Sequence, residues 1–148
     1  MAKENVRYFE DVELGEELGP LVKVPTTEAV RQFCSVWDPE VGASRFTDEA
    51  TARKEGLPHA LLPGIMNMSY LITLLTTWAP AGQVRKLDTV FRQPVPHNKS
   101  VRLVGIVTDK NVVDGENRVE CDVSLQREDG EAMVTGKAVV ILPSRESR

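Results

Sequence analysis

The first half of the chain places its apolar residues with the period of helices. A first amphipathic helix is expected to start at Thr26 or Thr27, whose hydroxyl would cap it. Its apolar residues recur every three or four positions: Ala29, Val30, Phe33, Cys34 and Trp37. A second, short helix is expected to begin at Thr47 or Asp48 and to stop at Gly56, because acidic residues occupy its first turn and basic residues its last.

A third helix is expected from residue 64 to residue 78, and it is apolar nearly all round. Its hydroxyl side chains gather on one side: Ser69, Thr73, Thr76 and Thr77. Asn67 lies on the opposite side, among apolar side chains. The polar residues make the segment too hydrophilic for a membrane span. A buried helix enclosed by other structure is therefore predicted.

The second half of the chain changes to an alternation of period two, which is typical of strands. Extended segments are expected at residues 21–24, 89–95, 101–107, 119–125 and 132–142. Asp114-Gly115 and Asp129-Gly130 are dipeptides that favour hairpin turns. The combined pattern predicts an antiparallel sheet curled around one apolar helix. This is an α+β layout of the kind called a hotdog fold.

Composition and charge limit the classes of protein to which the chain can belong. The 148 residues, 41% hydrophobic and 27% charged, suit one globular domain over residues 1–148, with 144–148 expected to form a disordered tail. The net charge of -4 argues against nucleic-acid binding. The first fifteen residues lack the apolar stretch of a signal peptide, so a cytoplasmic protein without a membrane span is expected. The two cysteines are far apart, so we expect reduced thiols and no metal site.

Four segments, taken in their order and spacing, resemble a known family. They are YFEDVELGEEL, LPHALLPGIMNMSYL, VFRQPVPHNKSVRLVGIVTD and DGEAMVTGKAVVILP. Together they are similar to the MaoC-like dehydratases, hotdog proteins that include the (R)-specific enoyl-CoA hydratases. The resemblance covers nearly the whole chain. It implies an acyl-CoA or acyl-carrier thioester as ligand, no separate cofactor, and chains that pair side by side.

The resemblance also implies a site. In the family, an aspartate after the first helix and a histidine about five residues later activate the water that adds to an α,β-unsaturated thioester. A backbone N–H at the start of the central helix holds the thioester oxygen. Asp38 falls on the aspartate and Gly64 on the helix glycine. Phe46, with Arg45 beside it, stands where the histidine would be, and Pro63 replaces the histidine that usually precedes the glycine.

Three side chains are candidates for acid/base work, each with a structural alternative. Asp38 would be the base, or a turn residue before a proline. His59 would replace the missing histidine, because an imidazole can both accept and donate a proton near neutral pH; the alternative is a loop residue that satisfies backbone groups. Asn67 would orient a water or hold the thioester carbonyl. It could equally be a buried amide bonded to backbone.

Other residues are expected to shape the pocket for the substrate. Arg45 would contact a CoA phosphate or pair with the catalytic aspartate, unless it is an ordinary surface arginine. Phe46 fills the space that a catalytic water would need. Pro63, Met66 and Phe91 are also expected to contact the acyl group.

These residues leave three functions open. The first is hydration of an enoyl thioester or the reverse dehydration. The second is a non-catalytic hotdog subunit that shapes the acyl pocket of a heteromeric hydratase, whose other chain keeps the Asp/His pair. The third is thioester hydrolysis, which ranks last because residues 64–78 contain no carboxylate. The partner is accordingly expected to be a second copy of the chain or a catalytic hotdog subunit.

Overall fold

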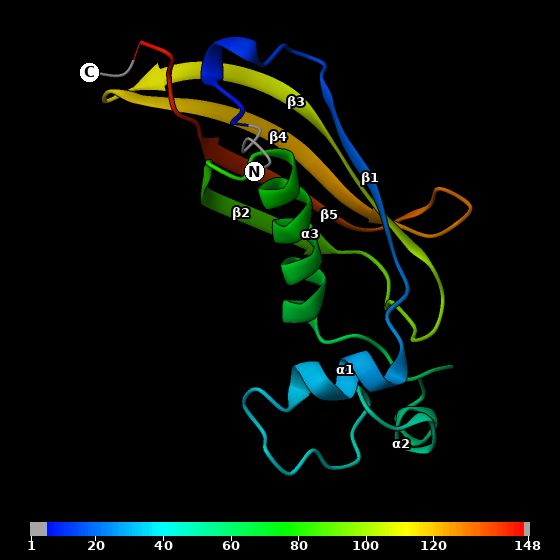
Figure 1. The fold of residues 1–148 in the computed structure, drawn as a ribbon. Helices are drawn as coiled ribbons and strands as arrows, with labels where there is room; N and C mark the ends of the chain where they lie inside the picture. The colour runs from blue at the N-terminus through cyan, green and yellow to red at the C-terminus, as the bar shows by residue number, and fades with distance from the viewer. Residues whose placement is uncertain (1–5, 147–148) are drawn as a thin grey trace, which may run out of the picture.

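One antiparallel sheet and one long helix dominate the computed structural model, which describes residues 6–146 (Figure 1). The elements are the short 3-10 helix η1 (Phe9–Asp11), β1 (Glu17–Lys23), α1 (Thr27–Cys34), α2 (Glu49–Lys54), α3 (Gly64–Trp78), β2 (Gln83–Phe91), β3 (Val101–Val113), β4 (Glu116–Gln126) and β5 (Ala132–Ile141). The strand order is β1-β3-β4-β5-β2, and every neighbouring pair is antiparallel. The outer edges of β1 and β2 therefore lie at the two ends of the sheet.

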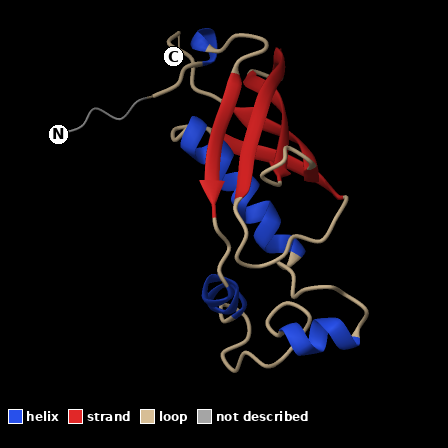
Figure 2. Ribbon diagram, turned by 90° about the vertical axis from the view of Figure 1, so that its right-hand side faces the viewer, coloured by secondary structure: helices blue, strands red, loops and turns tan. Residues whose placement is uncertain are grey.

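Helix α3 packs on one face of the sheet and supplies the centre of the core (Figure 2). The strands turn their apolar residues toward it, including Leu103, Val107, Val119, Leu125 and Val134. Leu71, Leu74 and Leu75 of α3 are completely buried among them. The other side of α3 is less well covered, since Ile65 and Ile72 remain 58% and 39% exposed. The expectation that this helix is enclosed on all sides is thus met on one side only.

The two short helices lie beyond the N-terminal end of α3 (Figure 1). Thr26 caps α1 by accepting a hydrogen bond from the Ala29 N–H, at 3.0 Å, and Asp48 caps α2 in the same way. The predicted stop of α2 is also confirmed, because Gly56 follows it with a φ of +87°. The long loop between α1 and α2 is thereby held next to the start of α3.

Two expected elements have different bounds in the structure. Helix α1 ends at Cys34, so Trp37 is not helical; its ring instead packs edge-on against Phe33, with 5.1 Å between the ring centroids. Strand β2 covers Gln83–Phe91 where residues 89–95 were expected. Polar and apolar side chains do not alternate regularly along this edge strand. A bulge between Val84 and Lys86 also interrupts the two-residue period.

The turns of the sheet and the end of the chain can also be compared with expectation. The predicted hairpin turn at Asp114-Gly115 is confirmed, with φ angles of 51° and 78°. Ser144 and Arg145 lie in the segment expected to be a disordered tail, yet both hydrogen-bond to the Glu10 carboxylate. Residues 147 and 148 of that expected tail lie outside the described residues.

The position of Leu71 in α3 gives a test of the core. Leu71→Ala should lower the free energy of unfolding by about 2–5 kcal/mol, because it leaves a cavity at the centre of the helix–sheet contact. Chemical denaturation measures this. The matched control is Thr77→Ala on the exposed side of the same helix, which should change stability by less than about 0.5 kcal/mol. Equal effects of the two variants would contradict the packing of α3 described above.

Candidate functional site

Asp38 is placed by the turn that ends α1. Its backbone N–H donates to the Cys34 carbonyl at 3.1 Å, which continues the helical turn beyond the last helical residue. The side-chain Oδ1 accepts a hydrogen bond from the Glu40 N–H at 3.2 Å, as aspartates before a tight turn commonly do. The second carboxylate oxygen has no hydrogen-bond partner among the described residues and stays available to water.

A buried threonine fixes the loop that follows. The Thr47 hydroxyl donates to the Gly42 carbonyl at 2.7 Å and accepts from the Ser44 N–H at 2.9 Å. The next residue, Asp48, accepts from the backbone N–H and the hydroxyl of Thr51, at 3.0 and 2.7 Å. These hydrogen bonds lower the pKa of Asp48. The loop is therefore a defined structure anchored at both ends.

A cavity of about 240 Å³ lies between this loop and the start of α3. It is lined by Cys34, Trp37, Asp38, Val41, Gly42, Ala43, Ser44, Phe46, Thr47 and Pro63. Asp38, Phe46 and Pro63, which sequence analysis had singled out, thus share one cavity. No histidine lines it. Its titratable groups are Asp38 and Cys34, and burial raises the pKa of the Cys34 thiol.

The start of α3 presents free hydrogen-bond donors. The backbone N–H groups of Gly64 and Ile65 have no acceptor among the described residues, and no side chain caps the helix. Both lie at the positive end of the helix dipole. The ring of Phe91 packs directly on Gly64, since an added Cβ there would come within 3.1 Å of the ring. An N–H donor and an aromatic surface therefore meet at this point.

His59 does not share the cavity of Asp38. Its Nδ1 lies 3.6 Å from the Glu49 carboxylate of α2, and half of its side chain is exposed. It lines a different cavity, of about 280 Å³, together with Lys99 and Met133. The expectation that His59 replaces the missing acid/base partner of Asp38 thus finds no support in the geometry.

The other histidine, His97, has a position that sequence analysis missed. It is buried, with Nδ1 3.0 Å from the Thr27 hydroxyl and Nε2 3.4 Å from the Leu61 carbonyl. It therefore joins the start of α1 to the segment that leads into α3. The only sequence signal was its place among the prolines of the segment after β2. This position makes His97 a residue that holds the candidate site together.

Three further candidates lie apart from the Asp38 cavity. Arg45 forms a two-pronged ion pair with Glu55, at 3.1 and 3.2 Å, so the expectation that it pairs with Asp38 is wrong. Met66 is buried in the core. Asn67 is 4% exposed, and its side-chain oxygen has no hydrogen-bond partner among the described residues. The alternative expectation, in which backbone N–H groups donate hydrogen bonds to the Asn67 side-chain oxygen, is therefore not met.

The described residues contain neither a candidate metal site nor a candidate membrane-spanning helix. Within residues 6–146, no group of three or more histidine, cysteine, aspartate or glutamate side chains could hold a metal ion. None of the helices in that range is long and apolar enough to cross a membrane.

Comparison with known proteins identifies the fold. No family model and no curated protein matches the sequence. Among solved structures, a MaoC-like dehydratase from Rhodospirillum rubrum aligns with a TM-score of 0.80 at 17% identity, over 95% of this chain and 99% of that chain. The (R)-hydratase from A. caviae involved in PHA biosynthesis aligns with a TM-score of 0.77 at 21% identity, over 90% and 99%.

A third similar structure is a complex of two chains. The ChsH1-ChsH2 complex from Mycobacterium tuberculosis aligns with a TM-score of 0.73 at 16% identity, over 88% of this chain and 98% of that chain. These likenesses confirm the predicted hotdog fold, a five-stranded antiparallel sheet around one long helix. At such identities they establish the fold of the chain.

The two cysteines allow the cavity to be tested chemically. In the native protein at pH 8, a thiol reagent should modify Cys34 before Cys121, because Cys34 lines a cavity whereas Cys121 is in the core. Burial and nearby carboxylates also raise the pKa of Cys121 to about 12, which leaves little reactive thiolate. Mass spectrometry of Cys34→Ser and Cys121→Ser variants assigns the modified thiol. Faster modification of Cys121 would show that the cavity is misplaced.

Proposed function

We propose that this chain belongs to the MaoC-like dehydratase and (R)-specific enoyl-CoA hydratase family and acts as the pocket-shaping subunit of an enoyl-thioester hydratase or dehydratase. The observation that carries the proposal is the composition of one cavity. Asp38 lines it together with Phe46 and Pro63, and no histidine reaches it. The fold, and the family positions of Asp38 and Gly64, support membership of the family.

The chemistry of hydration explains why the missing group matters. Addition of water to an α,β-unsaturated thioester needs a base for the water and a proton for the α-carbon. The enolate oxygen also needs a preorganised hydrogen-bond donor. The chain offers a carboxylate at Asp38 and free N–H donors at the start of α3. Among the described residues, neither a histidine nor a second carboxylate joins Asp38 in this cavity, and burial raises the pKa of its other titratable group, the Cys34 thiol. The second proton transfer therefore lacks the histidine that performs it in the family.

The uncovered side of α3 supports a partner chain. Ile65 and Ile72 project from α3 with large exposed fractions, and Phe91 does so at the end of β2, whose outer edge pairs with no described strand. Exposed apolar side chains beside a free strand edge are typical of a protein interface. Phe91 also touches Gly64. A chain that docks along β2 would therefore come close to the N–H donors of α3.

The likeness to a two-chain complex fits this arrangement. In the proposed assembly, a catalytic hotdog chain supplies the Asp/His pair, and this chain contributes wall residues such as Phe46 and Phe91. The ligand is an acyl-CoA or acyl-carrier thioester, which is the substrate class implied by the family resemblance.

One observation favours a second candidate, an active hydratase made of this chain alone. The free N–H groups of Gly64 and Ile65 would be an oxyanion site, and Asp38 would be the base that activates water. Thioester hydrolysis has weaker support, because α3 carries no carboxylate.

A hydration assay decides between the two candidates. The assay follows the loss of enoyl-thioester absorbance with short, long and ring-bearing enoyl-CoAs. The purified chain alone should hydrate none of them faster than the Asp38→Asn variant does. The physical reason is that the cavity holds neither a histidine nor a second carboxylate beside Asp38. Turnover by the wild type that Asp38→Asn abolishes would overturn the pocket-shaping role and establish the active hydratase.

The proposed pairing surface gives a separate prediction. Without the catalytic chain, two copies of this chain are expected to pair through the same apolar face. Ile72→Glu should then at least halve the mass of the particle that the purified chain forms, because a charge on α3 opposes burial of that face. Light scattering coupled to size-exclusion chromatography measures the mass. Thr77→Glu, in the last turn of the same helix and beside Arg7 and Asp11, is the matched control and should leave the mass unchanged. If Ile72→Glu also leaves it unchanged, the chain does not pair through this face.

A further inference from the structure

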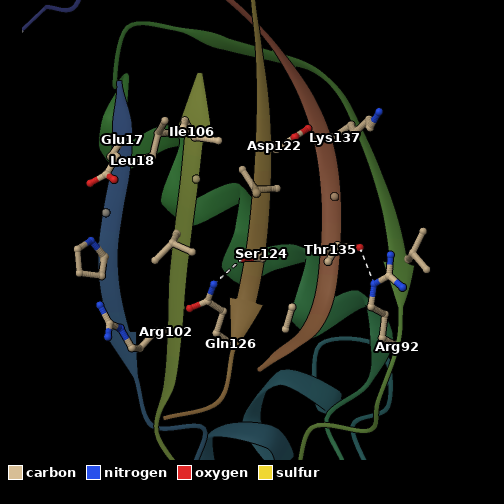
Figure 3. A pocket seen from close by; sticks show the side chains of 18 of the residues that line it. Glu17, Leu18, Arg92, Arg102, Ile106, Asp122, Ser124, Gln126, Thr135 and Lys137 are labelled. Carbon is tan, nitrogen blue, oxygen red and sulfur yellow. Dashed lines mark hydrogen bonds between the residues drawn. The ribbon is translucent and has the colours of Figure 1, made fainter. Parts of the chain in front are cut away.

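The face of the sheet opposite α3 carries a broad hollow with a volume of about 840 Å³ (Figure 3). No described helix packs on this face, so its side chains form part of the surface of the single chain. Gly105 and Gly136 lie beneath the hollow, and small side chains such as Ser124 and Thr135 form its floor. This face takes no part in the candidate site, which lies beyond the start of α3.

The strand register arranges the side chains of this face in three rows that cross the sheet. The acidic row consists of Glu17, Ile106, Asp122, Lys137 and Asp88. The neutral row consists of Val104, Ser124, Thr135 and Val90. The basic row consists of Arg102, Gln126, Ala132 and, beside them on the segment after β2, Arg92. Negative charge therefore predominates on one side of the neutral row, and only positive charge lies on the other.

The charged groups at the centre of this face lack partners within the chain. Arg102 is the one arginine in residues 6–146 whose guanidinium makes neither a hydrogen bond nor an ion pair. Glu17, Asp122 and Lys137 likewise make no side-chain ion pair or hydrogen bond within that range. The charged groups at the β2 end of the face do have partners, since Arg92 donates to the Thr135 hydroxyl at 3.2 Å and Asp88 lies 3.2 Å from the Lys86 ammonium.

We propose that this face binds the same face of a second copy of the chain, about a two-fold axis that runs along the neutral row. Such a rotation superposes the acidic row of one copy on the basic row of the other, in both directions at once. Arg92 then faces Asp88 of the partner subunit. Arg102 lies over the partner's Ile106, with Asp122 of the partner subunit diagonally beside it, one strand or about 4.8 Å away. Complementarity of this kind is what a two-fold interface requires, because the same patch must match itself.

The neutral row suits the centre of such a contact. It carries no charge, and Val104 and Val90 supply apolar surface beside the hydroxyls of Ser124 and Thr135. Stacked sheets pack about 10 Å apart, so the longer side chains of one copy would occupy the hollow of the other. An unrelated partner would need a matching charge pattern of its own, whereas a second copy already has it. Combined with pairing along β2, this contact assembles four chains.

Mass measurement with charge reversal tests the contact. Arg102→Glu should halve the mass of the assembly at low salt, because it puts carboxylates on both sides of the interface. Adding Asp122→Arg to the same chain should restore the larger mass, since the exchanged charges attract again. Glu128→Arg, a reversal on the loop between β4 and β5, is the control and should have no effect. Equal masses for the wild type and Arg102→Glu would overturn the proposal and leave the face open to another partner.

A crosslink gives an independent readout that needs no charge reversal. Ser124 lies on the proposed axis, so Ser124→Cys places two thiols opposite each other across the interface. In a Cys34→Ser background, which leaves Cys121 in the core as the one native thiol, a short bismaleimide should join them into a two-chain species. Glu128→Cys in the same background should give none. No crosslink at position 124 would overturn the proposal even if Arg102→Glu failed to fold. Neither readout involves enoyl-CoA turnover or Ile72, so this inference and the proposed function can fail separately.

Discussion

The packing of α3 on one face of the sheet is the contact on which the rest of the structure depends. Completely buried leucines of α3 meet the inward side chains of the strands, and this contact fixes the direction of the helix. Its N-terminal end consequently points toward α1, α2 and the loop between them. The free N–H groups of Gly64 and Ile65, the ring of Phe91 and the cavity of Asp38 are brought together there because of that direction.

The same contact leaves a one-sided structure. A single sheet can cover only one side of an apolar helix, so Ile65 and Ile72 stay exposed. The sheet face opposite α3 also remains open, with its charges sorted into rows. Two different surfaces are thus suited to bind partners, for two different reasons. The uncovered side of α3 is apolar and lies beside a free strand edge, whereas the sheet face opposite α3 is electrostatically self-complementary. The proposed function uses the first surface, and the further inference uses the second.

Much of this fold follows from the sequence, because hydrophobic period and turn residues are local signals. The bounds of α3, the hairpin at Asp114-Gly115 and the cap of α2 match expectation. Strand β2 is less predictable, because an edge strand with a bulge does not keep a clean alternation. The cavity shared by Asp38, Phe46 and Pro63 could be predicted only from the family resemblance, because residues far apart in sequence form it. The pairing of Arg45 with Glu55 and the role of His97 depend on tertiary contacts that no local pattern encodes.

In the proposed function, the cavity of Asp38 lacks the histidine of the family, and Phe46 stands at its position. The most direct test is the enoyl-CoA hydration rate of Phe46→His, measured with and without Asp38→Asn in the same chain. The account predicts a rise of about a hundredfold over the wild type, near the lower end of what a positioned acid or base contributes, and its loss when Asp38 is also changed. A Phe46→His variant that folds as the wild type does but hydrates no faster would contradict it.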